Sequence, residues 1–375
     1  MIAYIQDYAL HLPGRLSLAD VFAGQSAIEP LGPEMPVHWG APAHLTRSWQ
    51  WPYGLMPRGV AMAAESILLM QSPPSPSCGF VLGLSSLFSE PIYVQHMLEH
   101  GDNPLKMAEV IGFGGDFALD WLADLAGCSG PKIRLDSACA TGNDAVILAA
   151  QWLQSELCDH VLVVCASAML NPIGLALFRN IGALNDGSEP QASCPFDSRR
   201  RGFVMGEGSA ALLLSRRPTH ETVGLSGYGQ SMNAYKFTDL PDHSEPMARA
   251  MRNAWPASRL PAYISAHGTA TPQNDRVETQ LFKTLFGDQA GELQISATKS
   301  MTGHCLSATA LMESIVCVEA LKRQMAPPTL NLNQPDPECD LNYTPHSSMS
   351  ISGSGALNPA FAFGGHNSVT AWSLV

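Results

Sequence analysis

The chain has 375 residues, enough for one large or two medium domains. Hydrophobic residues make up 46% of the chain and charged residues only 14%, which predicts a large buried core and argues against long disordered stretches. The net charge of −12 argues against a general nucleic-acid binder or a binder of anionic membranes, because both need a basic surface.

The nine cysteines are scattered, and they form neither a CxxC pair nor a Cys/His spacing typical of a zinc site. We therefore expect no bound metal. Scattered single cysteines are typical of a reducing cytoplasm. The first residues lack the basic region and apolar run of a signal peptide, and the longest apolar runs are too short to span a bilayer. We expect a cytoplasmic protein without a membrane span.

Short apolar runs alternate with longer helical patterns along the chain. The short runs, often β-branched and bounded by Gly, Pro, Asp or Ser, predict strands at 79–84, 132–136, 160–166, 210–215, 262–266 and 293–297. The longer patterns predict helices at 59–71, 143–156, 276–286 and 306–324. This alternation predicts an α/β fold with largely parallel sheets.

Two of the predicted helices, 143–156 and 306–324, are apolar on almost every face. Such helices are buried between layers rather than lying on a surface. One helix of this kind in each part of the chain predicts two α/β halves, 1–216 and 217–375, which form one compact unit. No repeat is visible in the sequence itself, so this division follows from the expected architecture.

Cys139 lies in the sequence DSACATG at 136–142, after a predicted strand and before the helix 143–156. Its small neighbours permit a tight turn and the close approach of a substrate. The N-terminus of a helix favours negative charge, which lowers the pKa of a thiol and makes it nucleophilic near neutral pH. The alternative is a small, buried, inert cysteine, the interpretation that we give to most of the other eight.

Two later histidines, His267 and His304, each lie beside a glycine and are plausible partners of Cys139. His267 lies in AHGTATP at 266–272, just after a predicted strand, and His304 lies in TKSMTGH at 298–304, just before the helix 306–324. A lone histidine is more often structural than catalytic. In α/β sheets, however, ligands gather at the carboxyl ends of strands, so two histidines at such places favour a shared active site with Cys139.

The three stretches, in this order, resemble the β-ketoacyl synthases, the condensing enzymes of fatty-acid and polyketide assembly. The sequences CPFD at 194–197 and GFVMGEG at 202–208 also resemble segments of that family, and we interpret them as structural turns and strand ends. The resemblance runs from about Cys78 to the end. It implies a thiolase-like fold, with two similar α/β halves in a layered αβαβα arrangement.

The family's chemistry implies a role for each motif residue. Cys139 would accept an acyl chain from an acyl carrier protein, and malonyl carrier would then lose carbon dioxide to give an enolate. The neutral N–H groups of His267 and His304 would stabilise that enolate. Glu313 lies in an apolar helix and needs a cation, and the family's matching pair implies Lys299.

Thr269 and Thr271 match threonines that hold the phosphopantetheine arm of the carrier. Both hydroxyls face one way if the segment is extended, and local turn bonding is the alternative. The sequence FAFGGHNSV at 361–369 resembles the family's glycine-rich loop. Phe363 would be its gate, and the N–H groups of Phe363 and Cys139 would form an oxyanion hole. Ala362 replaces the usual first glycine.

Residue types discriminate within this superfamily. An initiating synthase would use Cys-His-Asn, a thiolase would use a second cysteine near the C-terminus, and a chain-length factor would lack the nucleophile. The sequence thus favours an elongating Cys-His-His synthase. The alternative to this enzyme is a non-catalytic partner that shapes a heterodimer's tunnel.

The resemblance implies no permanently bound cofactor, an acyl carrier protein as partner, and a homodimer or a heterodimer with a chain-length factor. Fatty-acid and specialised polyene or polyketide pathways both stay open, with a slight lean towards the specialised one.

Overall fold

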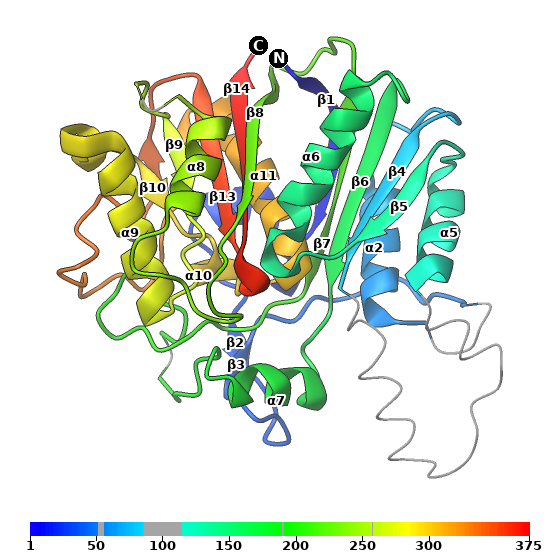
Figure 1. The fold of residues 1–375 in the computed structure, drawn as a ribbon. Helices are drawn as coiled ribbons and strands as arrows, with labels where there is room; N and C mark the ends of the chain where they lie inside the picture. Colours follow the sequence, from blue (N-terminus) through cyan, green and yellow to red (C-terminus); the bar gives the residue numbers. More distant parts are fainter. Residues whose placement is uncertain (52–55, 86–114, 190, 257) are drawn as a thin grey trace.

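The computed structural model describes residues 1–51, 56–85, 115–189, 191–256 and 258–375 (Figure 1). Its main sheet has ten strands in the order β10-β9-β13-β14-β8-β1-β7-β6-β4-β5. In chain order these strands are β1 (Ala3–His11), β4 (Gly79–Leu84), β5 (Lys132–Leu135), β6 (His160–Ser167), β7 (Gly208–Ser215), β8 (Val223–Met232), β9 (Tyr263–Ser265), β10 (Ile295–Ser296), β13 (Gly355–Phe361) and β14 (His366–Leu374). Two small two-stranded sheets pair β2 (Glu29–Pro30) with β3 (Trp39–Gly40) and β11 (Met325–Ala326) with β12 (Met349–Ser350).

The sheet consists of two sets of five strands with the same topology. In the set β1, β4, β5, β6, β7 and in the set β8, β9, β10, β13, β14, the strands lie side by side in the order third, second, fourth, fifth, first. The first strands of the two sets meet antiparallel, where Ala3 pairs with Leu225 and Tyr4 with Gly224. The largely parallel sheet that we expected is therefore wrong. Five of the nine neighbouring pairs are antiparallel: the fifth strand of each set runs against both the fourth and the first, and the two first strands run against each other.

The longer helices form layers on and between these strands (Figure 1). Helices α2 (Arg58–Leu69) and α5 (Gly115–Ala126) cover the outer face of the first set, while α8 (Glu245–Ala254) and α9 (Pro272–Phe286) cover that of the second. Helices α6 (Thr141–Gln154) and α11 (Leu306–Arg323) pack against each other and against strands of both sets. The layered αβαβα arrangement of a thiolase-like fold is confirmed. The other helices are α1 (Leu18–Phe22), α7 (Pro172–Asn180) and α10 (Lys299–Thr302).

The two central helices are buried as their composition predicted. Helix α11 is buried from Leu306 to Leu321, and most of its apolar side chains belong to the largest core cluster. Gly142 in α6 allows the close approach of the two helices, because a Cβ built at this residue would lie 2.2 Å from the Leu311 nitrogen. Helix α11, from the second half of the chain, thus packs directly against α6, the helix that follows the Cys139 turn.

The predicted elements agree with the structure in place, with shifts at their ends. The strand at 79–84 has the predicted bounds, whereas the strand predicted at 293–297 shortens to Ile295–Ser296. Helix α9 begins at Pro272, four residues before the predicted start, because the Thr271 hydroxyl caps it and proline fits its first turn. In the part of the chain that the structure describes, no helix is long and apolar enough to cross a membrane.

Candidate active site

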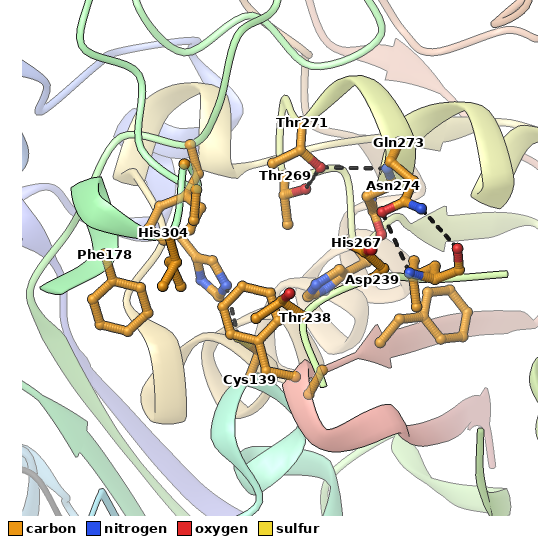
Figure 2. A pocket seen from close by; sticks show the side chains of 18 of the residues that line it. Cys139, Phe178, Thr238, Asp239, His267, Thr269, Thr271, Gln273, Asn274 and His304 are labelled. Atoms are coloured by element: carbon orange, nitrogen blue, oxygen red, sulfur yellow. Dashed lines mark hydrogen bonds between the residues drawn. The ribbon is translucent and has the colours of Figure 1, made fainter. Parts of the chain in front are cut away.

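Cys139, His267 and His304 line one pocket, with a cavity volume of about 280 Å³ (Figure 2). Cys139 comes from the turn before α6, His267 follows β9, and His304 precedes α11. The remaining wall is mostly apolar, with a few hydroxyl, amide and carboxylate groups from Thr238, Asp239, Thr269, Thr271, Gln273 and Asn274. Among the described residues, no cluster of three or more histidine, cysteine or acidic side chains could hold a metal ion.

The turn that carries Cys139 is fixed by its own side chains. Ala138 has a left-handed backbone, with φ of 51°, which a non-glycine residue adopts only at a cost. The Ala138 N–H donates to Asp136 Oδ1 at 3.0 Å, and the Ser137 N–H donates to the Thr141 hydroxyl at 2.8 Å. That hydroxyl in turn donates to the Ala138 carbonyl at 2.7 Å. These bonds hold the strained turn that points the Cys139 thiol into the pocket.

The place of Cys139 before a helix does not acidify its thiol. Burial raises its pKa to about 12, although the Lys299 charge and the backbone N–H of Cys139 act in the opposite direction. Our expectation of a lowered pKa at the helix N-terminus is therefore wrong. The reason is that the hydration which a thiolate loses in this enclosed site outweighs the stabilisation that it gains from the Lys299 charge and the Cys139 N–H.

The His304 ring is aimed at Cys139, with Nε2 3.1 Å from the sulfur (Figure 2). Its other nitrogen, Nδ1, accepts the backbone N–H of Leu306 at 3.2 Å and lies 3.0 Å from the Thr309 hydroxyl. A backbone N–H can only donate, so Nδ1 is the unprotonated nitrogen of the neutral ring. The neutral tautomer therefore carries its proton on Nε2 and points that N–H at the sulfur.

His267 faces His304 across the pocket, with ring centroids 5.7 Å apart at an interplanar angle of 87°. The backbone N–H groups of His267 and Gly268 donate to the two carboxylate oxygens of Glu278, at 2.7 and 2.9 Å. Burial, followed by the nearby Lys299 charge, holds the pKa of both imidazoles well below the ordinary value. Both rings are therefore neutral near pH 7.

Lys299 and Glu313 form a buried ion pair behind the histidines. The Lys299 ammonium lies 2.7 Å from Glu313 Oε1, and both side chains are almost fully buried. The Thr298 hydroxyl donates to the same carboxylate oxygen at 3.2 Å. This is the pairing that the sequence and the resemblance suggested. Its cation contributes to the lowered pKa of both imidazoles.

Thr269 and Thr271 both line the pocket, but the segment between them is not extended. Ala270 has φ of 63°, and this left-handed residue brings the two hydroxyl oxygens within 2.9 Å of each other (Figure 2). The Thr271 hydroxyl also accepts the Asn274 N–H at the start of α9. The expectation of an extended segment is therefore wrong. The two threonines form the local turn bonds that we gave as the alternative, and both still face the same pocket.

Phe363 lies in the loop between β13 and β14 and lines the same pocket. The N–H groups of Ala362, Gly364 and Gly365 donate to the His366, Phe237 and Ala362 carbonyls. Among the described residues, the Phe363 N–H has no carbonyl partner of this kind. This donor is therefore available near the thiol, as an oxyanion hole would require.

Sequence reasoning missed several groups that shape the site through distant contacts. The Phe203 ring lies edge-on to His304, with centroids 5.0 Å apart. Phe203 lies in the GFVMGEG segment that we interpreted as structural only. Glu207 of that segment forms an ion pair with Arg58, whose guanidinium nitrogen lies 2.8 Å from the Glu207 carboxylate. Glu278 and Thr309 were also missed, because a motif does not reveal which side chain supports it from another turn.

Comparisons with known proteins identify the family. The family model described as the N-terminal domain of β-ketoacyl synthases matches residues 68–220, and the one described as the C-terminal domain matches residues 223–333. The 3-oxoacyl-[acyl-carrier-protein] synthase 2 of Synechocystis sp. is 36% identical over 258 residues, which cover 66% of this chain and 62% of the relative. The tetracenomycin polyketide synthase ketoacyl synthase alpha subunit of Streptomyces glaucescens is 36% identical over 255 residues, which cover 65% of this chain and 60% of the relative. The alignments thus span about three fifths of these curated relatives.

Solved structures are similar over the whole chain. A ketosynthase structure, from a complex of a type II PKS acyl-carrier protein with its ketosynthase, matches with a TM-score of 0.88 and 26% identity, covering 100% of this chain and 99% of that chain. A β-ketoacyl synthase from Burkholderia phymatum matches with a TM-score of 0.84 and 25% identity over the same shares. The chain therefore belongs to the β-ketoacyl synthase family.

Proposed function

We propose that this member of the β-ketoacyl synthase family is an acyltransferase that forms carbon–carbon bonds. It would catalyse the decarboxylative Claisen condensation of malonyl carrier protein with an acyl chain held as a thioester on Cys139. The observation that carries the proposal is the fixed, neutral imidazole of His304, whose Nε2–H points at Cys139 Sγ from 3.1 Å. A donor of this kind suits a reaction that develops negative charge on oxygen beside the sulfur.

Loading is a thioester exchange. The Cys139 sulfur attacks the carbonyl carbon of the acyl carrier thioester, and the carrier thiol leaves with the proton that the cysteine gives up. The high pKa of the free thiol means that the thiolate forms only in the encounter with substrate, where the Lys299 charge and the Cys139 N–H favour it. The tetrahedral oxyanion would lie between the N–H groups of Cys139 and Phe363.

Condensation follows on the loaded enzyme. The malonyl thioester loses carbon dioxide, and the electron pair of the broken bond becomes an enolate whose oxygen would accept N–H bonds from His267 and His304. The enolate carbon attacks the thioester on Cys139, a β-ketoacyl carrier leaves, and the cysteine recovers its thiol by taking up one proton. Two neutral imidazoles suit this step because each keeps one N–H that can donate to the oxyanion.

The remaining site residues support these steps. Lys299, paired with Glu313, helps to keep the imidazoles neutral through its charge. Thr269 and Thr271 would hold the phosphopantetheine arm that the carrier delivers, and no permanently bound cofactor is needed for the chemistry. Phe363 would gate the acyl pocket.

The same proposal includes partners and organisation. The partners would be an acyl carrier protein and a second subunit, either another copy or a chain-length factor. In support, β5 forms an outer edge of the described sheet and leaves Ile133 40% exposed, as an edge strand that pairs with another chain would. We also propose a division of the chain at 216/217. A cytoplasmic location would suit the nine cysteines, all of which are unpaired.

The alternative is a non-catalytic subunit of the chain-length-factor type, which would keep the fold and shape a heterodimer's tunnel. Incubation with an acyl carrier protein, followed by intact-mass measurement, separates the two functions. We expect the wild-type chain to gain the mass of one acyl group and Cys139→Ala to gain none, because the substitution removes the attacking sulfur. No gain on the wild type, or an equal gain on the variant, would contradict the enzyme.

A further inference from the structure

Two asparagine side chains lie at the centre of the molecule, where the surrounding groups are mostly apolar. Asn143 and Asn358 are both fully buried. The Asn143 amide donates to the Asn358 and Ser368 carbonyls at 2.8 and 3.0 Å. Its oxygen accepts the Asn358 amide at 3.0 Å and the Thr370 hydroxyl at 3.2 Å. Asn143 therefore joins helix α6 to both strands of the β13–β14 hairpin.

Asn358 continues this network to the other central helix. Its amide nitrogen donates to the Ala310 carbonyl at 2.6 Å and to the Ser314 hydroxyl at 2.9 Å, both in α11. Ser314 adjoins Glu313, the partner of Lys299. The two amides together thus connect the helix that follows Cys139, the helix that follows His304, and the hairpin whose loop contains Phe363.

Stability alone gives a poor account of these amides. A buried amide is costly unless its polar atoms are satisfied, and Asn358 Oδ1 has no hydrogen-bond partner among the described residues. Replacing buried polar groups by apolar ones of similar volume is often neutral or stabilising. An amide that is retained at such a cost, and that bonds three site-bearing elements, is better explained by the geometry it fixes.

We propose that Asn143 and Asn358 are positioning residues that hold the Phe363 loop in register with the Cys139 turn. Asn143 lies four residues after Cys139, and Asn358 lies on the strand that leads into the Phe363 loop. Their mutual hydrogen bonds set the separation of the two N–H groups that would form the oxyanion hole. The inference rests on the proposed function, because only that function gives the two donors a common oxyanion.

The steps of the proposed reaction depend on this register to different degrees. Acyl loading passes through a tetrahedral oxyanion at the Cys139 and Phe363 N–H groups. Decarboxylation of a malonyl thioester involves no attack on a carbonyl, and its enolate would rest on His267 and His304. Loss of the register should therefore slow loading more than carbon dioxide release, whereas a loss of folded protein would reduce both equally.

The test compares the two rates in Asn358→Leu. This substitution keeps the side chain's approximate volume, and Asn143 keeps its bonds to the two carbonyls and to the Thr370 hydroxyl. Acyl-enzyme formation from an acyl carrier protein is measured by intact mass, and carbon dioxide release from malonyl carrier protein is measured on unloaded enzyme. We expect the ratio of loading to release to fall at least about 10-fold, because misplacement of a reacting geometry by about 1 Å costs rates of this order or more.

Ser66→Ala is the matched control. It removes an equally buried hydroxyl in the outer helix α2, where Ser66 contacts Ser209 far from the pocket. The control should keep the wild-type ratio. An unchanged ratio in folded Asn358→Leu would overturn the inference. If that variant does not fold, Asn358→Ser, which keeps a hydroxyl but loses the reach to both helices, must show the same fall in the ratio.

Failure of this inference and failure of the proposed function give different results. A wild-type chain that neither loads an acyl group nor releases carbon dioxide would contradict the proposed function itself. A wild-type chain that does both, with a variant that keeps their ratio, would contradict only the positioning role.

Discussion

The turn before α6 and the turn before α11 lie at equivalent places, after the third strand of each five-strand set, and present different side chains to the pocket. Cys139 lies two residues before the start of α6, and His304 lies two residues before the start of α11. Each follows a residue with a left-handed backbone, Ala138 with φ of 51° and Gly303 with φ of 63°. In the proposed function, equivalent places in the two five-strand sets would thus supply a nucleophile on one side and a hydrogen-bond donor on the other.

The difference between the two turns lies in what supports them. The Cys139 turn is held by neighbouring side chains, the Asp136 carboxylate and the Thr141 hydroxyl. The His304 turn is backed by the buried charge of Lys299 with its partner Glu313. Burial drives both groups to their neutral forms, raising the pKa of the thiol and lowering that of the imidazole. One architecture therefore yields opposite pKa shifts, because desolvation penalises whichever form is charged.

Removing Lys299 tests how much the ion pair behind the His304 turn contributes to the free energy of unfolding. Lys299→Met should lower the free energy of unfolding by about 3–5 kcal/mol, because it leaves the Glu313 carboxylate buried without its cation. The double variant Lys299→Met/Glu313→Leu should recover most of that loss. Denaturant unfolding of the wild type and the three variants measures both values, with Glu313→Leu completing the cycle. A double variant as unstable as Lys299→Met would show that the pair does not act as a unit.

Exchanging the residues that precede the two functional side chains tests the equivalence of the turns. Gly303→Ala should cost about 1–3 kcal/mol, because a Cβ there would lie 2.9 Å from the Val204 carbonyl oxygen on a left-handed backbone. Ala138→Gly should change stability by less than about 1 kcal/mol, since relief of strain offsets the added freedom of the unfolded chain. Thermal unfolding measures both losses of stability. A larger loss in Ala138→Gly would contradict the backbone strain assigned to Ala138.

The pH dependence of thiol alkylation tests the nucleophile side without altering the chain. The pKa of Cys139 is raised to about 12, so the thiolate fraction should rise about tenfold per pH unit between pH 7 and 9. The rate of carbamidomethylation of Cys139 by iodoacetamide, followed by peptide mapping, should rise in the same way. A rate that levels off by pH 8 would mean a thiol acidified by its helix, and burial would then not control its pKa.

The lowered pKa of His304 makes the folded chain less stable as the pH falls. The folded pKa of His304 lies below the unfolded value of about 6.5, so the unfolded chain binds the proton first as the pH falls. The contribution of this group to stability is present above about pH 6.5 and is lost as the pH falls below it.

The sequence could place the motif residues in one site, because each lies at the end of a strand or the start of an apolar helix. It could also suggest the Lys299–Glu313 pair, since a carboxylate in an apolar helix needs a cation. It could not give the thiol's pKa, which depends on burial by the whole pocket rather than on the local motif. Nor could it give the orientation of the two threonines, because the left-handed backbone of Ala270 has no signature in that residue type.

The supporting contacts could not be read from the sequence. Phe203, Glu278 and the two central asparagines act across long distances in the chain or from another turn, and each is an ordinary core residue until the fold brings it to its partner. The strand directions were misjudged for a similar reason. Alternating strands and helices indicate parallel neighbours, but the fifth strand of each set pairs antiparallel with both the fourth and the first.

His304 is assigned as a hydrogen-bond donor to the enolate that is not needed to load the cysteine. A single-turnover assay tests this role most directly. Wild type and His304→Ala are first loaded with an acyl group, malonyl carrier protein is added, and loss of the acyl-enzyme is followed by intact mass. We predict that His304→Ala still carries the acyl group but consumes it about 10²–10³-fold more slowly, the cost of losing one such donor. Consumption at the wild-type rate, or a variant that cannot be loaded, would contradict the assignment.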